Sequence, residues 1–376
     1  MEEGKKQAYN RTKNRRLVLD YLRLNHSASA TKLSDSLHLS NAAMSSILKE
    51  LLQKNQITEA SKKSESGKGR KQVYYSLNKN FGLIAIFHLD SNCFHLYLAN
   101  SKEELLESEM YEVDEKNINA STIAYMKEKL KELLEQPKYR SIPLLRILFS
   151  SPSLVDCRNR EIHSPLLTDP YFQGNQWLIG FEDDFPGAKV LVSNSIHLAM
   201  EAEIHYGNRS RNGSAILVSN NHRIGGAIAI NKEVLLGENG YMGDFAALQA
   251  IFRGKLRCLS EFASVESIMN HFGKKDFSSL LYDYQNDIQV KAYILETVHS
   301  AARALFVVSR LLNISTFIFT GSIVALGEGV IDAVESEFNK DPVIKVKTTI
   351  SSIGKQGIIL GAIHHAMDDV LNEEEN

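Results

Sequence analysis

Residues 27–54 read SASATKLSDSLHLSNAAMSSILKELLQK and carry two short helical patterns joined by a two-residue connection. In the first pattern Leu33 and Leu37 are four positions apart, so both lie on one helix face. The second pattern covers residues 41–54. Ser40 directly precedes it and is a suitable N-cap, because a serine hydroxyl can accept a backbone N–H of the first helical turn. This arrangement predicts a helix-turn-helix motif.

The second of these helices has two different faces. Apolar residues at helical spacing predict a buried stripe: Met44, Ile47, Leu48, Leu51 and Leu52. The opposite face carries small or polar side chains: Asn41, Ala42, Ser45, Ser46 and Lys49. Such a face can enter the major groove of double-stranded DNA and present amide and hydroxyl groups to base edges. We therefore predict that these five residues contact DNA; the alternative is an ordinary solvated helix face.

The flanking sequence extends the motif to a winged helix-turn-helix. Apolar residues after Arg15 predict a preceding helix. Downstream, residues 72–77 alternate as a strand does, and Gly67 and Gly69 supply turn conformations for a hairpin. Three cations at the tip of this wing suit the phosphate backbone or the minor groove: Lys68, Arg70 and Lys71. The pattern predicts a DNA-binding domain over residues 1–80.

Charge is distributed unevenly along the chain. Residues 1–80 contain 16 Lys and Arg against seven Asp and Glu, a net charge of +9. The whole chain carries −2, so the remaining residues carry −11. A basic module on an acidic body is expected where only one end of a protein meets phosphates.

The composition indicates a globular protein of two or three domains, since 43% of the 376 residues are hydrophobic. The chain has no apolar run long enough to span a membrane, and its N-terminus lacks the apolar stretch of a secretory signal. We therefore expect a cytoplasmic protein with no membrane partner. The three cysteines lie far apart in the sequence, which argues against a disulfide framework and against a clustered metal site.

Beyond residue 80, buried strands alternate with helices. Leu144–Phe149 and Thr316–Thr320 are typical of buried strands, whereas Ala120–Leu134 and Val290–Leu312 have the spacing of helices. Strands that lead into helices in this rhythm predict a layered α/β body.

Five segments of this body resemble motifs of the ROK family, whose name joins repressors, open reading frames and kinases. These segments are Ser150–Asp156, Ser193–Ala199, Arg223–Ile228, Gly237–Asp244 and Phe317–Ser322. The resemblance covers nearly the whole chain and points to the repressor branch, of the xylose and N-acetylglucosamine type. It implies an α/β protein in which an N-terminal winged helix-turn-helix precedes an actin-like, two-lobed sugar-kinase (ribonuclease-H-like) fold. The body would cover residues 81–376, with one lobe of residues 81–192 and a C-terminal helix at 357–372, and a second lobe of residues 193–356.

Departures from the family pattern predict that the body is not an enzyme. Where kinases of this family have D-x-G-G-T, residues 88–92 read HLDSN, so both glycines that let backbone approach phosphate are absent. The second phosphate loop, residues 221–227, has likewise gained larger side chains. Ser195 stands where the resemblance places the catalytic aspartate, and a hydroxyl cannot act as a general base near neutral pH. We predict no catalytic residue and no cofactor.

The zinc site of the family is also missing from the sequence. The family uses one histidine and three cysteines, and the matching positions here are Ala247, Ile251, Arg253 and Cys258. One ligand of four cannot hold structural zinc, so no metal is predicted.

The family's sugar-binding positions are only partly kept. They correspond to Asn194, Ser195, Asp244, Ala247 and Ser260. Polar recognition of a sugar needs several converging partners, which disfavours a free sugar in the family's usual pose. His222 and Arg223 can pair with a phosphate, so a sugar phosphate or related anion is the predicted effector. The alternative is that both are solvated loop residues and that the ligand pocket is closed or vestigial.

These patterns together predict a repressor that acts in carbohydrate metabolism and binds a two-fold related DNA operator as a homodimer or tetramer. The apolar helix at residues 290–312 offers surface for such self-association. Two alternatives are a ROK-type sugar kinase with a DNA-binding appendage, and a DNA-binding protein whose body only serves as an oligomerisation scaffold.

Overall fold

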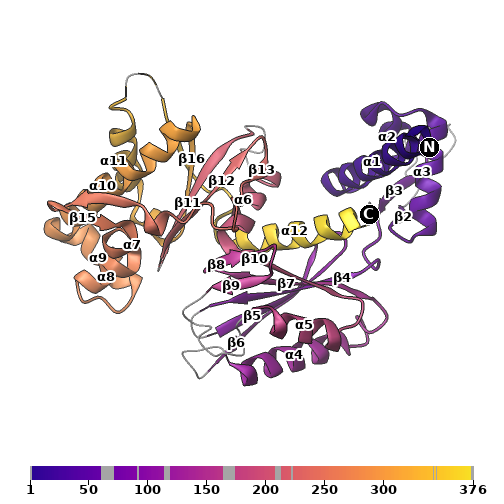
Figure 1. The fold of residues 1–376 in the computed structure, drawn as a ribbon, viewed down its shortest axis with the longest axis horizontal. Helices are drawn as coiled ribbons and strands as arrows, with labels where there is room; N and C mark the ends of the chain where they lie inside the picture. The colour runs from indigo at the N-terminus through magenta and orange to yellow at the C-terminus, as the bar shows by residue number, and fades with distance from the viewer. Residues whose placement is uncertain are drawn as a thin grey trace. The chain divides into compact units, whose positions relative to one another are not determined.

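The computed structural model describes residues 2–60, 72–90, 93–113, 119–163, 174–207, 213–221, 223–341, 343 and 345–373. Two compact units make up the chain (Figure 1). Unit 1 consists of residues 1–149, 176–191 and 366–376, and unit 2 of residues 150–175 and 192–365.

Unit 1 begins with a winged helix-turn-helix. Its elements are α1 (Glu2–Asn25), β1 (Ala28–Ser29), α2 (Ala30–Leu37), α3 (Asn41–Gln53), β2 (Ile57–Ala60) and β3 (Tyr74–Leu77). The strands form an antiparallel sheet in the order β1-β3-β2. Ser29 and Ser40 cap α2 and α3 by accepting backbone N–H groups, and His38 turns the chain between these helices with a φ of 54°. The helix α1 starts at Glu2, well before the predicted start near Arg15. The residues between these positions are mostly polar, so they add little to the apolar stripe that marks the helix in the sequence.

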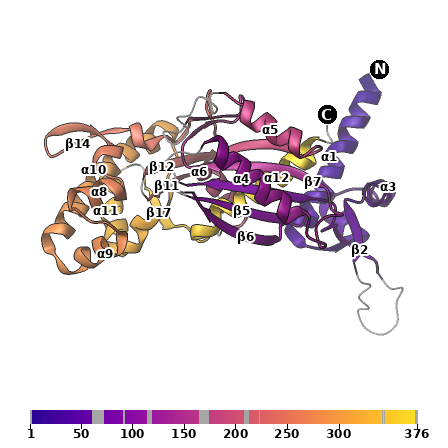
Figure 2. The same ribbon diagram turned by 90° about the horizontal axis from the view of Figure 1, so that it is seen from below.

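The rest of unit 1 is built on a five-stranded sheet in the order β10-β7-β4-β5-β6 (Figure 2). Its strands are β4 (Leu83–Leu89), β5 (Cys93–Asn100), β6 (Leu105–Glu112), β7 (Leu144–Ser151) and β10 (Lys189–Asn194), and the ends of the last two belong to unit 2. Two helices, α4 (Ala120–Leu134) and α5 (Gln176–Asp184), cover one face, where Phe149 packs 5.2 Å from Phe87 and 5.0 Å from Phe181, measured between ring centroids. Residues 366–373 of α12 (Gly357–Glu373) lie on the other face (Figure 1).

Unit 2 is built on a sheet in the order β13-β12-β11-β16-β17. The strands are β11 (Ala215–Asn220), β12 (Ile224–Ile230), β13 (Glu233–Val234), β16 (Thr316–Thr320) and β17 (Lys347–Ile350), and β16 runs parallel to both β11 and β17. Alternation along β11 separates two cores. Ile216 and Val218 join the larger core with α10 (Ile288–Leu312) and α11 (Glu328–Phe338), whereas Leu217 packs with α6 (Ser195–His205) and the start of α12.

The remaining elements of unit 2 surround this sheet. They are β8 (Leu154–Asp156), β9 (Glu161–His163), η2 (Phe245–Ala247), β14 (Gln249–Phe252), β15 (Lys255–Cys258), α7 (Leu259–Phe262), α8 (Val265–His271), α9 (Phe277–Asn286), η3 (Ser322–Leu326) and η4 (Gly354–Gln356). None of the helices in the described part of the chain combines the length and the apolar character needed to span a lipid bilayer.

Candidate DNA-binding face and ligand site

The outer face of α3 carries the residues that the sequence predicts for it. All five are exposed: Asn41, Ala42, Ser45, Ser46 and Lys49. The opposite face packs into the winged helix-turn-helix through Met44, Ile47, Leu48 and Leu51, while Leu52 is half-buried. Within the described residues, the four polar side chains of the outer face have no hydrogen bond or ion pair with the protein. They are available to an external partner.

A carboxylate on the inner side of α3 fixes this helix to α1. Glu50 accepts a hydrogen bond from Arg15 Nη1 at 2.8 Å and one from Arg11 Nε at 3.1 Å. Burial alone would raise the pKa of Glu50, but the two guanidinium groups outweigh it and hold the pKa below its ordinary value. Glu50 is therefore ionised at neutral pH, and the direction in which α3 presents its outer face depends on α1.

The wing follows α3 as an antiparallel hairpin. Strands β2 and β3 pair from Ile57 opposite Leu77 to Ala60 opposite Tyr74, which confirms the predicted hairpin. The three cations predicted at its tip, Lys68, Arg70 and Lys71, lie outside the described residues.

In unit 2, two of the predicted ligand residues stand at the start of α6. Asn194 is the N-cap: its side-chain oxygen accepts from the backbone N–H of Ile196 at 2.8 Å and of His197 at 3.4 Å. Its amide nitrogen donates to the carbonyl of Ser153 at 2.8 Å. Ser195 is buried at the first helical position. Much of the hydrogen-bonding capacity of Asn194 is thus used inside the protein.

His197 is a residue of this region that the sequence did not single out. It is buried, and its Nε2 donates to the carbonyl of Met242 at 2.7 Å. Burial lowers the pKa of His197, so the ring is neutral. The contact joins the start of α6 to the loop that contains Asp244, and so brings two predicted parts of the ligand site together. A histidine three positions after a capping asparagine was the only sequence signal for it.

The other predicted ligand residues lie on loops. Asp244 is exposed, and its carboxylate does not cap η2, the short helix that follows it. Arg223 is exposed at the start of β12 and forms no ion pair within the described residues. His222 lies outside the described residues.

The loop after β11 is closed by its own side chains. The Oδ1 of Asn221 accepts from the backbone N–H of Ser322 at 2.7 Å and from the Ser322 hydroxyl at 3.0 Å. Asn220 is buried, donates to the carbonyl of Ala263 and accepts from the N–H of Val265. The backbone N–H of Ser322 is therefore already paired with a side chain of this region.

The positions that match the family's zinc ligands make other contacts in this protein. Arg253 lies over the ring of Tyr293, 4.5 Å from its centroid, and pairs with Glu296 at 2.9 Å. Ile251 is exposed on the adjacent strand, and Cys258 is a free, half-buried thiol. Arg253 thus joins the β14–β15 hairpin to α10 by a cation–π contact and an ion pair.

Comparison with known protein families decides the classification. The model of the ROK family matches residues 91–367, which is most of the chain. The chain belongs to the ROK family. It is 25% identical to the xylose repressor of Staphylococcus xylosus, over 73% of this chain and 72% of the repressor. It is 21% identical to the DNA-binding transcriptional dual regulator NagC of Escherichia coli, over 73% of this chain and 67% of that protein.

Solved structures of this ROK family share the fold. A ROK family transcriptional regulator, described as a homologue of the Escherichia coli MLC protein, superposes with a TM-score of 0.79 at 18% identity and covers 98% of both chains. The ROK hexokinase of Thermus thermophilus superposes with a TM-score of 0.64 at 17% identity, over 77% of this chain and 99% of the hexokinase. The chain therefore has an actin-like sugar-kinase body in addition to its winged helix-turn-helix, as the sequence predicted.

Proposed function

We propose that this ROK protein is a transcriptional repressor that binds double-stranded operator DNA through residues 1–80. The observation that carries the proposal is the outer face of α3, which presents exposed polar side chains beside a buried apolar stripe. A face of this kind suits direct readout in the major groove. Relatives named xylose repressor and N-acetylglucosamine repressor support a role in carbohydrate metabolism.

The body of the protein is proposed to bind without catalysing. Ser195 stands where the family resemblance puts a general base, and a buried serine cannot take a proton from a sugar hydroxyl at neutral pH. In addition, the backbone N–H of Ser322 already donates a hydrogen bond to the side chain of Asn221. The second candidate function, a sugar kinase with a DNA-binding appendage, is supported by the kinases that share the fold. A phosphate-release assay with ATP and a panel of sugars distinguishes the two.

The proposed effector is a sugar phosphate or a related anion. Arg223 supplies an exposed guanidinium at the start of β12, and Asp244 supplies an acceptor for sugar hydroxyls on a loop tethered to α6 through His197. Asn194 contributes less than the family pattern implies, because its amide caps α6. Titration calorimetry with sugars and sugar phosphates would show binding; a body that only serves as an oligomerisation scaffold would bind none of them.

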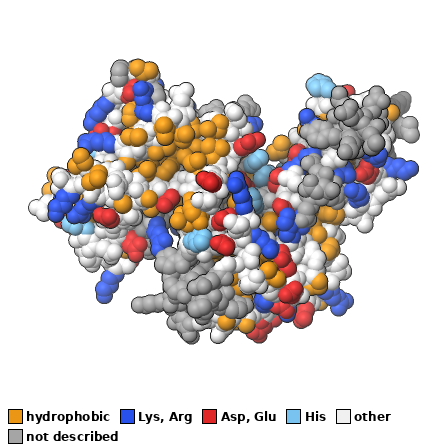
Figure 3. Space-filling model, viewed as in Figure 1, with side chains coloured by type: hydrophobic (Ala, Val, Ile, Leu, Met, Phe, Trp, Pro, Cys, Tyr) orange, Lys and Arg blue, Asp and Glu red, His pale blue; other side chains and the backbone are white. Residues whose placement is uncertain are grey.

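Self-association is proposed to involve the outer side of α10. Val307 and Leu311 lie one helical turn apart and are 65% and 82% exposed. Figure 3 shows hydrophobic side chains gathered over the part of unit 2 where α10 leads into β16. Exposed apolar surface of this kind marks interaction sites, and a cytoplasmic homodimer or tetramer would bury it.

The direct test of the proposed function is selection of bound sequences from random DNA by the full-length protein. A repressor with two-fold symmetry should enrich a palindromic site with two half-sites. Recovery of no enriched sequence, while binding to bulk DNA persists, would contradict sequence-specific readout by α3.

A further inference from the structure

One side of α1 faces away from the winged helix-turn-helix core and carries charged residues. Arg16, Asp20 and Arg23 follow at intervals of four and three positions, so they share one helix face. The residues that pack inside the domain, Val18 and Leu22 among them, lie on another face. Both faces belong to the same helix that Arg15 and Arg11 join to α3 through Glu50.

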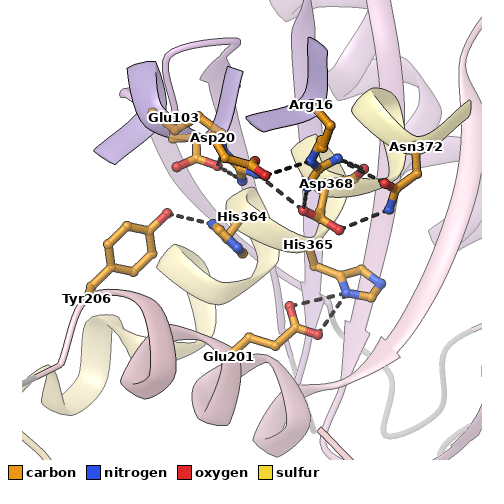
Figure 4. A network of polar contacts seen from close by, with 10 residues as sticks. Arg16, Asp20, Glu103, Glu201, Tyr206, His364, His365, Asp368 and Asn372 are labelled. Atoms are coloured by element: carbon orange, nitrogen blue, oxygen red, sulfur yellow. Dashed lines mark hydrogen bonds and ion pairs between the residues drawn. The ribbon is translucent and has the colours of Figure 1, made fainter. Parts of the chain in front are cut away.

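The charged face of α1 contacts the C-terminal end of α12 within unit 1. Arg16 pairs with Asp368 through Nη2 and donates through Nη1 to the side chain of Asn372 at 2.9 Å (Figure 4). It also donates to the backbone carbonyl of Asp368 at 3.3 Å. Asn372 in turn donates to Asp368 at 3.1 Å. One guanidinium therefore holds a carboxylate, an amide and a carbonyl of the last two turns of α12.

A second guanidinium joins α1 to the turn between β5 and β6. Arg23 pairs with Glu103 through both Nε and Nη2 and reaches Asp368 at 3.3 Å. The side chains of Arg23 and Glu103 are only 5% and 13% exposed. A charge pair withdrawn from water in this way keeps its geometry, because either partner left alone would be buried without compensation.

The β5–β6 turn is shaped around this contact. Glu103 has a φ of 64°, a left-handed conformation that a glycine would adopt with less strain but without a carboxylate. The side chain of Asn100 holds the turn by accepting from the backbone N–H of Lys102 at 2.9 Å and of Glu104 at 3.2 Å. The position of the Glu103 carboxylate is thus fixed from within the body.

We propose that the contacts of Arg16 and Arg23 with Asp368, Asn372 and Glu103 are an ionic lock that orients the DNA-binding domain on the body. In a dimer, that orientation sets the distance between the two copies of α3. The lock therefore determines which separation of two DNA half-sites the protein binds tightly, and its members act as positioning residues. This inference rests on the proposed function as a two-fold symmetric DNA-binding protein.

The same helix offers a matched control. Asp369 is the neighbour of Asp368 but pairs with Arg146 of β7 at 2.6 Å and with Lys189 of β10 at 3.0 Å. These contacts hold α12 to the sheet of unit 1, and none of them reaches α1. A loss of positioning should follow from substitutions at Asp368 and Glu103, and not from the same substitution at Asp369.

The test uses full-length protein and operators in which two half-sites are moved apart by single base pairs. The wild-type protein should bind the best separation at least about tenfold more tightly than one changed by half a helical turn, since rigid geometry forbids simultaneous contact. Combined Asp368→Asn and Glu103→Gln substitutions should reduce this ratio to below about threefold while affinity for a single half-site stays within about twofold. Asp369→Asn should keep the wild-type ratio. Asp368→Glu, which keeps the negative charge, should retain most of that ratio.

Thermal unfolding of each variant separates positioning from stability. The substituted amides keep the shape of the lock residues and an oxygen that accepts from Arg16 or Arg23, so the combined variant should be less stable than the wild type but remain folded at the assay temperature. If it keeps the wild-type spacing ratio, or if Asp369→Asn flattens the ratio equally, the ionic lock does not position the domain. A wild-type protein that binds its selected site without any preference for separation would overturn the lock while leaving the DNA-binding proposal intact. A wild-type protein that selects no DNA site would overturn the proposed function and the lock together.

Discussion

The outer face of α3 and the loop after β11 both carry small polar side chains, but they use them in opposite ways. On α3 the side chains of Asn41, Ser45 and Ser46 are exposed and form no hydrogen bond with other described residues. At the end of β11, Asn220 and Asn221 are bonded to backbone groups of neighbouring segments. The first surface is available for recognition, whereas the second is occupied by the protein itself.

Two proteins can share a fold and still differ in which ligands they bind. The body shares the fold of a ROK hexokinase, and the Asn221 side chain at the end of β11 is bonded to Ser322 of the neighbouring segment. Unpaired polar groups cost free energy unless water or a partner satisfies them, so a site that has lost its ligand is stabilised when its own side chains fill it. Substitutions in each region test whether the two differ in this way.

The largest effect is expected at the wing. Changing Lys68, Arg70 and Lys71 together to alanine should remove up to about three phosphate contacts and weaken binding to specific and random DNA alike, by roughly 100-fold at 0.15 M salt. Affinity measured across a salt series should show a correspondingly shallower slope. An unchanged slope would mean that the wing does not reach the phosphates.

A smaller and more selective effect is expected on α3. Asn41→Ala should remove one base contact, worth about 1 to 3 kcal/mol of discrimination, and relax preference at one position of each half-site. Competition between operators that differ at single positions measures this preference. Asn286→Ala, at an exposed amide at the end of α9, is the control and should leave every position unchanged. Full discrimination by the α3 variant would show that another face of the domain meets the bases.

Local patterns in the sequence predicted which side chains of α3 are buried and which are exposed, apart from the half-buried Leu52, because a helical period of 3.6 residues decides both. The cap Ser40 was equally readable, since capping acts within one helical turn. The ionic lock could not be predicted in this way. Arg16 and Asp368 are 352 positions apart, and a charged helix face is compatible with simple solvation until the fold supplies the partner.

The ligand region shows the same limit. The family resemblance selected Asn194 as a ligand residue, which stays a prediction, whereas its role as the N-cap of α6 was not predicted. His197 was missed because its partner is the carbonyl of Met242, a group that every residue carries and that no sequence pattern marks. Pairings between side chains and distant backbone are fixed by tertiary packing alone.

A further effect, on stability instead of DNA binding, is expected where α3 meets α1. Glu50→Gln should lower the free energy of unfolding by about 1 to 2 kcal/mol at pH 7, because it replaces charge-assisted bonds from Arg15 and Arg11 by weaker ones. The folded protein holds the pKa of Glu50 below its unfolded value, so this stabilisation is present above about pH 4.5 and is lost as pH falls through the folded pKa. Denaturant unfolding at several pH values should show that the difference in unfolding free energy between the wild-type protein and Glu50→Gln becomes smaller in acid. Glu59→Gln, at an exposed residue of β2, is the control and should change the free energy of unfolding at pH 7 by less than about 0.5 kcal/mol.

The smallest effect is expected from an attempt to restore catalysis. Ser195→Asp returns a carboxylate to the position of the general base, yet two other features remain. Asn221 still holds the backbone N–H of Ser322, and residues 88–92 still lack the glycines that would let backbone approach a phosphate. Like charge adds to this defect, because Asp90 stands within that segment and would repel ATP. Sugar-dependent ATP turnover should therefore stay at background in the variant, as in the wild-type protein, with an active ROK kinase as the positive control. Turnover in the wild-type protein would establish the kinase function instead, and turnover in the variant alone would show that the filled loop after β11 can still open to a nucleotide.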